Sequence, residues 1–426
     1  MQRLFVLGVH MKPYTFLLIA LFSATPLFAQ NDSAKAITLE ELLAEALQHN
    51  PELRAAEAGH HAAAARISQM SALDDPRFAI EIEEAPGTAP FKTSEWKFLN
   101  FGISQMLPFP GKLAKARRIA EIDAEHAHHD YAEKRLDIIT QIKAAYFKLY
   151  FMQRARAVND ENLTLMQHFV KIAQARYAVG IVMNQDVLKA NVELAKLANE
   201  QITLQQQEEI TTARLNILLN RPPQSPLGRA VLPERKAAAF DLEELQQYAL
   251  AHRPMIHHDA LSVTQSRTAN SLAKSQYWPD LDLSLKYVTS PFDGFNGWTA
   301  MAGFNLPFAF WSSKKYRGRI EETEAETRMK EAMLNNSRNM VKFMVQEALV
   351  GVQSAQRSVE LYRDSVLPQA EQALQATIAA YQTRQTDFLM LLDSYRMLQM
   401  FKLEYHEATA MYEMNLAELE RAVGKM

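Results

Sequence analysis

Four short segments alternate apolar and polar residues with a period of two, the pattern of a strand with one apolar and one polar face. In the clearest one, "DLDLSLKY" at 280–287, the leucines and the tyrosine share one face and the polar residues share the other. "GWTAMAGFNL", "RFAIEIEE" and "WKFLNFGISQML" repeat this pattern more or less cleanly. We therefore predict strands at about 77–84, 96–107, 280–289 and 297–307.

Between the strand pairs the pattern changes to long stretches without helix breakers. Neither glycine nor proline occurs from Lys112 to Val179, and a helix over 112–179 would be about 100 Å long. A second long helix is expected at 315–382, with shorter helices at 183–220 and 385–423. The low glycine content, 13 of 426 residues, agrees with a mainly helical chain.

The first long helix is expected to follow directly from a strand, in "ISQMLPFPGKLAKARR" at 103–118. Pro108 and Pro110 cannot donate to a strand ladder, and Gly111 permits backbone angles that other residues avoid. These three residues predict a sharp strand-to-helix corner.

The chain is internally duplicated. "LEELLAEALQHNPEL" at 39–53 and "LEELQQYALAHRPMI" at 242–256 share eight of fifteen residues at an offset of 203. We place the first repeat at 30–237 and the second at 238–426, each with short helices, two strands, a long helix and a further helix. A period near 200 is far longer than that of solenoid repeats, so each copy forms half of the architecture.

Lengths and strand number then predict the assembly. No segment after the N-terminal region offers the roughly 18 consecutive apolar residues of a membrane-spanning helix, so membrane entry would use strands. Four strands cannot close a barrel, and open edges are not tolerated in lipid. The predicted fold is therefore mainly α with a transmembrane β portion: long helices form an α-barrel tunnel, and three copies contribute four strands each to a 12-stranded β-barrel.

The N-terminal region has the features of an export signal. Lys12 precedes an apolar run at 16–21, and a small-residue cleavage site ends at Ala29, which predicts a signal peptide at 1–29 with Met1 or Met11 as the start. The formal net charge of −3 offers no nucleic-acid footprint, and the sequence contains no cysteine.

These features, with "LLAEALQHNPEL", "ISQMLPFPGKLAKAR", "ARYAVGIVMNQDVLKANVEL" and "AAYQTRQTDFLMLLDSYRML" in order, make the chain similar to the TolC-type outer-membrane efflux protein family. The resemblance covers essentially the whole mature length. It implies a homotrimer in the bacterial outer membrane that extends into the periplasm and contacts outer-membrane lipid. It also implies an exit duct of a tripartite efflux pump, joined through a periplasmic adaptor to an inner-membrane transporter. The Phe-Pro-Gly-Lys corner resembles the heavy-metal branch.

The resemblance also implies that the helical tips dock the adaptor. The residues concerned are Tyr177, Val179, Gly180 and Ile181 in one repeat and Tyr381, Thr383, Arg384 and Gln385 in the other. Gly180 also suits a left-handed cap at the end of the long helix, so a purely structural role is the alternative.

Two aspartates just past the tips are candidate gate residues. The resemblance places Asp393, and less directly Asp186, near a periplasmic constriction where threefold symmetry would gather three carboxylates and favour cations. Met390 occupies the position where some relatives carry a second aspartate. The alternative for Asp186 is a helix-start acid that satisfies backbone donors.

Histidines occur in clusters at 60–61, 126–129 and 257–258. Adjacent residues point apart on a helix and no zinc-enzyme spacing is present, so we expect solvated histidines and no metal site. No nucleophile, phosphate loop or dinucleotide motif occurs, and neither an enzyme nor a cofactor is predicted.

A second class of protein fits the helical pattern, namely a periplasmic coiled-coil adaptor or scaffold that enters no membrane. Two amphipathic strand pairs at a fixed spacing have no evident purpose in such a protein, which favours the channel.

Overall fold

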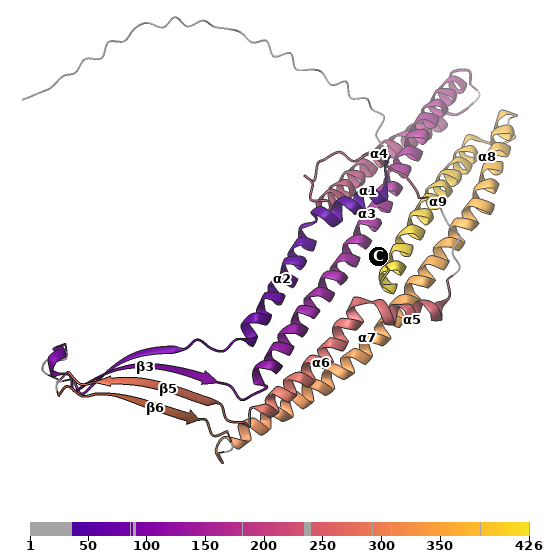
Figure 1. Cartoon of the computed structure of the whole chain (residues 1–426). Coiled ribbons are helices and arrows are strands. Elements are labelled where there is room, and N and C mark those ends of the chain that lie inside the picture. The colour runs from indigo at the N-terminus through magenta and orange to yellow at the C-terminus, as the bar shows by residue number, and fades with distance from the viewer. Residues whose placement is uncertain are drawn as a thin grey trace, which may run out of the picture. The chain divides into compact units, whose positions relative to one another are not determined.

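The computed structural model describes residues 36–85, 87, 91–180, 182–233, 240–291, 293–307, 309–383 and 385–425 (Figure 1). The predicted signal peptide at 1–29 and two predicted tip residues, Ile181 and Arg384, lie outside the described residues. In the described part of the chain, no helix is both long enough and apolar enough to cross a membrane.

The strands form one antiparallel sheet that combines both repeats. Its members are β2 (Arg77–Glu83), β3 (Phe98–Leu107), β5 (Leu281–Thr289) and β6 (Asn296–Phe304). The order is β2-β3-β5-β6, so the central pair joins a strand of the first repeat to a strand of the second (Figure 1).

Two strand boundaries differ from the predicted ones by two residues or more, and the others agree to within one residue. β3 begins at Phe98 rather than at 96, because a 3-10 turn at Thr93–Glu95 precedes it. β6 ends at Phe304 rather than at 307. The Asn305 side chain accepts a hydrogen bond from the backbone N–H of Asp280 at 2.6 Å, and this contact replaces the next step of the ladder.

The helices of the two repeats correspond in order. The first repeat contains α1 (Leu39–His49), α2 (Pro51–Ser71), α3 (Lys112–Ala178) and α4 (Asn184–Leu218), and the second contains α5 (Leu242–His252), α6 (Pro254–Ser275), α7 (Ser313–Leu361), α8 (Leu367–Gln382) and α9 (Phe388–Val423). Two shorter helices pack along each long one: α2 and α4 along α3, and α6 and α9 along α7 (Figure 1).

The second long helix is not one continuous α-helix, contrary to the prediction for 315–382. α7 passes into a π-helical turn, Tyr362–Val366, before α8 begins. Pro368 explains the turn, because proline lacks a backbone N–H and crowds the carbonyl four residues earlier. The helix predicted from 385 begins at Phe388, because the Asp387 side chain caps it by accepting from the backbone N–H of Met390 at 3.0 Å.

Equivalent residues of the two repeats fix the sharp corners between their short helices. Asn50, between α1 and α2, accepts hydrogen bonds from two backbone N–H groups of α2 and donates its own amide to the carbonyl of Leu218 at 2.9 Å. Arg253, between α5 and α6, donates to the carbonyl of Ala422 at 3.1 Å and to Glu133 of α3 at 3.0 Å. Each corner is thereby attached to the C-terminal end of α4 or α9.

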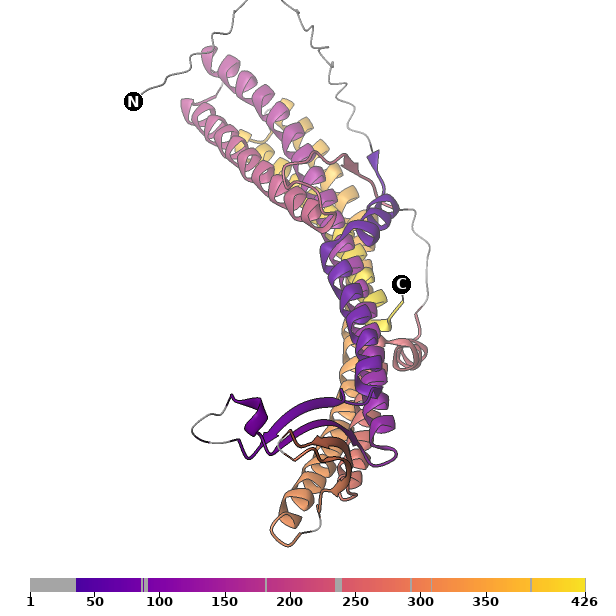
Figure 2. The ribbon, with the colours of Figure 1, turned by 60° about the vertical axis from the view of Figure 1, so that its left-hand side comes forward.

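Three apolar clusters along the helices hold the chain together. One joins α1, α3 and α4 and includes Tyr146, whose hydroxyl donates to a backbone carbonyl and accepts from the backbone N–H of Val231. A second joins α3, α4, α8 and α9, and a third joins α5, α7 and α9. A parallel pair of two-residue strands, β1 (Ala36–Ile37) and β4 (Arg229–Ala230), covers the first cluster. The sheet lies at one end of the long helices and the hairpin tips lie at the other (Figure 2).

Candidate functional site

The strand register gives the sheet one continuous apolar face. Residues directly opposite each other on paired strands share a face, and Ile103 lies opposite Phe78 on one side and Leu285 on the other. The same face carries Phe78, Ile80, Ile82, Leu99, Phe101, Ile103, Leu283, Leu285, Tyr287, Trp298, Ala300, Ala302 and Phe304. Several of these side chains are strongly exposed, including Phe78 at 68% and Trp298 at 69%.

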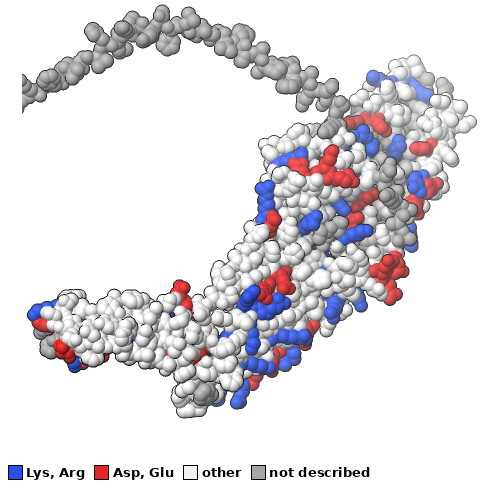
Figure 3. Space-filling model, in the orientation of Figure 1, with Lys and Arg blue, Asp and Glu red and all other residues white. Residues whose placement is uncertain are grey.

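The opposite face is polar. Lys286 of β5 forms an ion pair of 2.6 Å with Glu81 of β2, and Asn100 of β3 lies directly opposite Glu81. On the side seen in Figure 3, charged side chains are sparse over the sheet and numerous over the helices and at the loop end of the sheet. An exposed sheet with one apolar and one polar face is typical of strands that separate lipid from water.

The predicted corner residues position two side chains that the sequence analysis did not single out. Gly111 adopts a left-handed backbone, with φ of 92°, as the N-cap of α3. The bend brings the backbone N–H of Phe109 to within 2.8 Å of Asp280 Oδ1, and Lys112 Nζ to within 2.7 Å of the same oxygen. Since Asp280 directly precedes β5, the first-repeat corner is tied to the second-repeat strand.

The first hairpin tip, between α3 and α4, is exposed and apolar. Tyr177, Val179 and Met183 are exposed by 48%, 68% and 74%. Gly180 has a φ of 72°, and its backbone N–H donates to the carbonyl of Tyr177 at 2.9 Å, so it closes the helix in a left-handed conformation. The predicted left-handed cap at Gly180 is therefore present, and the apolar side chains beside it are exposed.

The second tip, between α8 and α9, differs. Tyr381 was predicted at the docking surface, but its side chain is buried, because its ring packs in the second apolar cluster and lies 4.3 Å from the Arg176 guanidinium. Thr383 donates its hydroxyl to the last carbonyls of α8, and the backbone N–H of Gln385 donates to Ala380. Tyr381 thus joins the two hairpins, and Thr383 and Gln385 form the end of the second.

The two candidate gate aspartates lie in different surroundings. Asp186, in the first turn of α4, is half-buried and lines a 350 Å³ pocket between the tips, together with Arg176 and Phe388. Asp393, in the second turn of α9, is exposed, as is Met390 one turn earlier. The structure therefore does not bring the two carboxylates into one cluster.

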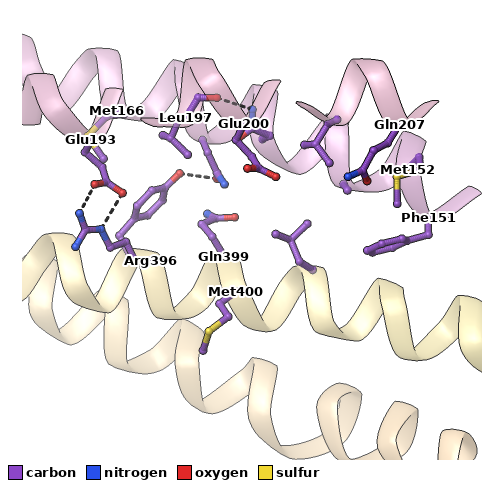
Figure 4. A pocket seen from close by; sticks show the side chains of 16 residues that line it. Phe151, Met152, Met166, Glu193, Leu197, Glu200, Gln207, Arg396, Gln399 and Met400 are labelled. Atoms are coloured by element: carbon purple, nitrogen blue, oxygen red, sulfur yellow. Dashed lines mark hydrogen bonds and ion pairs between the residues drawn. The ribbon is translucent and has the colours of Figure 1, made fainter. Parts of the chain in front are cut away.

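A larger pocket of 410 Å³ lies between α3, α4 and α9 (Figure 4). Glu193 of α4 and Arg396 of α9 face each other across one end of it in a two-point ion pair, with Nε to Oε1 at 2.9 Å. Tyr395 donates its hydroxyl to Asn162 Oδ1 at 2.7 Å. Burial raises the pKa of Tyr395, so the hydroxyl keeps the proton that it donates.

The sequence carries no clear signal for this group. Asn162 stands in the polar run "NDENLT" at 159–164, and its burial is apparent only in the structure. Glu193 and Arg396 look like ordinary exposed helix charges in the sequence, because their pairing depends on how α4 and α9 lie side by side. The group links the two hairpins through polar contacts and contains no catalytic arrangement.

The family model described as "Outer membrane efflux protein" matches residues 42–221 and 245–425. Among curated proteins, the chain is 23% identical over 410 residues to the cobalt-zinc-cadmium resistance protein CzcC of Cupriavidus metallidurans. This match covers 95% of this chain and 93% of CzcC. It is 22% identical over 237 residues to the toxin and drug export protein A of Aggregatibacter actinomycetemcomitans, covering 54% of this chain and 51% of that protein.

Solved structures of outer-membrane channels share the fold. The outer membrane protein VceC from Vibrio cholerae matches with a TM-score of 0.76 and 20% identity, over 91% of this chain and 96% of that one. The channel OprN matches with a TM-score of 0.78 and 19% identity, over 91% and 90%. Both the sequence match and the amphipathic sheet favour an outer-membrane channel over the periplasmic adaptor or scaffold. The chain belongs to the outer membrane efflux protein family, and it is an outer-membrane channel of a tripartite efflux pump that extends into the periplasm and is not an enzyme.

Proposed function

We propose that three copies of the chain close a 12-stranded barrel by pairing the outer edge of β2 with the outer edge of β6 in the next copy. The observation that carries this proposal is the sheet itself. Its apolar face suits lipid, yet no described strand covers the outer edge of β2 or β6. Unpaired backbone groups are costly in lipid, and closure between copies satisfies them.

The helices support the same assembly. α4 leaves an apolar stripe exposed in one chain, formed by Leu188, Val192, Ile202, Ile210 and Ile217, and α7 leaves another, formed by Met329, Met333, Met340, Phe343 and Val350. α7 follows β6 of the sheet, and α4 packs along α3, which follows β3. Three copies placed side by side would cover them and enclose an α-helical tunnel below the barrel.

Engineered cysteines test the closure, because the natural sequence has none. Ala79→Cys in β2 is combined in turn with Gly297→Cys, Thr299→Cys or Met301→Cys in β6. Within one chain these strands are the two edges of the sheet, about 14 Å apart by strand spacing, which is too far for a disulfide. One combination should give a covalent trimer under oxidising conditions. Monomers alone for all three combinations would contradict the proposed closure.

The exposed first tip is the proposed docking surface for the periplasmic adaptor, through which the channel reaches the inner-membrane transporter. Val179 and Met183 are among the most exposed apolar side chains, and apolar exposure at a helical hairpin suits a second helical hairpin as partner. Val179→Asp should weaken binding of the purified cognate adaptor while leaving the trimer intact. Phe91→Asp, which places the same charge on an exposed apolar residue of the β2–β3 loop far from the tip, is the control. Equal adaptor binding by Val179→Asp and wild type would leave the tip with a capping role only.

Asp393 is the stronger candidate for a carboxylate ring, because it is exposed whereas Asp186 lines a pocket between hairpins. Three symmetry-related carboxylates would attract cations and repel anions near the periplasmic end. In planar bilayers, Asp393→Asn should reduce the preference of the channel for cations more than Asp186→Asn does. An unchanged reversal potential for Asp393→Asn would show that Asp393 does not line the pore.

Heavy-metal cations are the proposed cargo class. The match to the relative named a cobalt-zinc-cadmium resistance protein covers 93% of that protein. The match to the toxin and drug export protein covers only 51% of that protein. Deletion of the gene should sensitise cells to cobalt, zinc or cadmium salts. Sensitivity to organic drugs with unchanged metal tolerance would assign the channel to a drug pump.

A further inference from the structure

Seven histidines from three distant segments meet across three helices. Ring contacts run from α2 to α3 and from α3 to α6, with centroid separations of 4.4 to 5.7 Å. We call this set the histidine band; its members are His60, His61, His126, His128, His129, His257 and His258. The expectation of separate solvated histidines treated each segment alone, and helix packing brings the segments together.

The densest part of the band lies between α3 and α6. The rings of His126 and His258 are 4.4 Å apart between centroids. His258 Nε2 is 3.7 Å from Asp130 Oδ1, and its Nδ1 is 3.2 Å from Asp259 Oδ1. His126 and Asp130 are one helical turn apart on α3, so two nitrogen donors and a carboxylate gather at one point of the helix pair.

The spacing is close to that of a metal site. Two ligands bound to one zinc ion at about 2.0 to 2.1 Å in tetrahedral geometry lie about 3.4 Å apart, and the Nε2 to Oδ1 separation of 3.7 Å exceeds this only slightly. No three histidine or acidic side chains within the described residues already surround a common point. Capture of an ion therefore requires the His126 ring to turn from Ser262, to which its Nε2 has only a long contact of 3.4 Å.

The site is open to solvent. Asp130 is 70% exposed at its side chain and His258 33%, so an ion from solution can reach both. The carboxylates would offset part of the charge that the ion brings.

We propose that His126, Asp130 and His258 bind a divalent transition-metal cation that joins α3 to α6. Imidazole with carboxylate suits Zn²⁺, Co²⁺, Ni²⁺ and Cu²⁺, whereas Mg²⁺ and Ca²⁺ prefer oxygen ligands alone. Asp259 is within contact of His258 and orients its ring. The three ligands come from one protomer, so the proposal depends neither on barrel closure nor on the identity of the cargo.

Titration of the purified, detergent-solubilised protein with Zn²⁺ tests the site. We expect saturable binding of one Zn²⁺ per protomer, unaffected by excess Mg²⁺. His126→Ala and His258→Ala should each weaken binding by about 10-fold or more. His61→Ala removes a ring from the far end of the band and should keep the wild-type affinity. Failure of the wild type to bind Zn²⁺, or equal losses in all three variants, would overturn the proposal.

Two measurements on the wild-type protein do not depend on how the variants fold. Co²⁺ in a four-coordinate nitrogen and oxygen site absorbs visible light far more strongly than hydrated Co²⁺, and this absorption should appear on binding and disappear on addition of Zn²⁺. Because the ion connects two helices of the folded state, Zn²⁺ should also raise the thermal unfolding temperature while Mg²⁺ does not. A spectrum identical to that of hydrated Co²⁺, with no thermal shift by Zn²⁺, would refute a defined site.

Discussion

The two faces of the sheet can be distinguished by placing the same charge on each. Leu285 and Met301 are long apolar residues on neighbouring strands, but Leu285 lies on the apolar face and Met301 on the polar one. Leu285 is the fifth of the nine residues of β5, at the middle of the strand and hence near the middle of the bilayer. Arginine on the lipid face at that depth costs about 2–4 kcal/mol, or about 6–12 kcal/mol for three copies.

A loss of that size is comparable to the whole stability of many folded proteins, about 5–15 kcal/mol. Leu285→Arg should therefore abolish the heat-sensitive trimer band of outer-membrane fractions on gels. Met301→Arg should leave the trimer band, because its side chain would extend into water. Assembly of Leu285→Arg at the wild-type level, or equal failure of both variants, would refute the assignment of the apolar face to lipid.

Three further changes probe the helical part. Arg396→Gln leaves the buried Glu193 carboxylate without its two-point partner and should lower the free energy of urea unfolding by about 1–3 kcal/mol. Gly180→Ala places a side chain on a left-handed residue, so amide exchange in the last turn of α3 should quicken by the equivalent of about 1–2 kcal/mol. Burial and nearby cations lower the pKa of His406, so the folded state favours its neutral form. Stability should then fall as pH drops below the unfolded-state pKa of about 6.5, and His406→Gln should lose less stability than wild type between about pH 7.5 and about pH 5.5.

Local pattern was sufficient for most of the secondary structure. The period-two segment at 280–287 predicted β5 because burial of one face of a strand imposes that period, and the absence of helix breakers from Lys112 onward predicted α3. Pro368 was visible in the sequence, but whether it kinks, ends or widens a helix depends on the packing around it. In the structure a π-helical turn, Tyr362–Val366, connects α7 directly to α8.

Contacts between distant helices were not predictable in the same way. Glu193 and Arg396 are separated by 203 residues, and their meeting depends on the axial alignment of α4 and α9, for which a single sequence carries no local signal. The histidine clusters were visible, but their union depends on the register of α3 against its neighbours. Tyr381 was predicted at the docking surface because the resemblance places the helical tips there, and position at a tip does not tell which side of the helix is buried.

The duplicated corner shows why equivalent positions need not be equivalent in chemistry. Asn50 is short, caps its own helix and reaches only the end of α4, so it stabilises the first repeat from within. Arg253 makes no cap hydrogen bond with its side chain, yet it reaches α9 of its own repeat and Glu133 of the other. With its side chain almost fully buried, Arg253 is held by this ion pair and by the carbonyl of Ala422, since an unpaired buried guanidinium would be very costly. The longer side chain thus attaches the second repeat to the first where α3 passes beside it, a role that the shorter amide cannot fill, and the two repeats have become complementary halves rather than interchangeable copies.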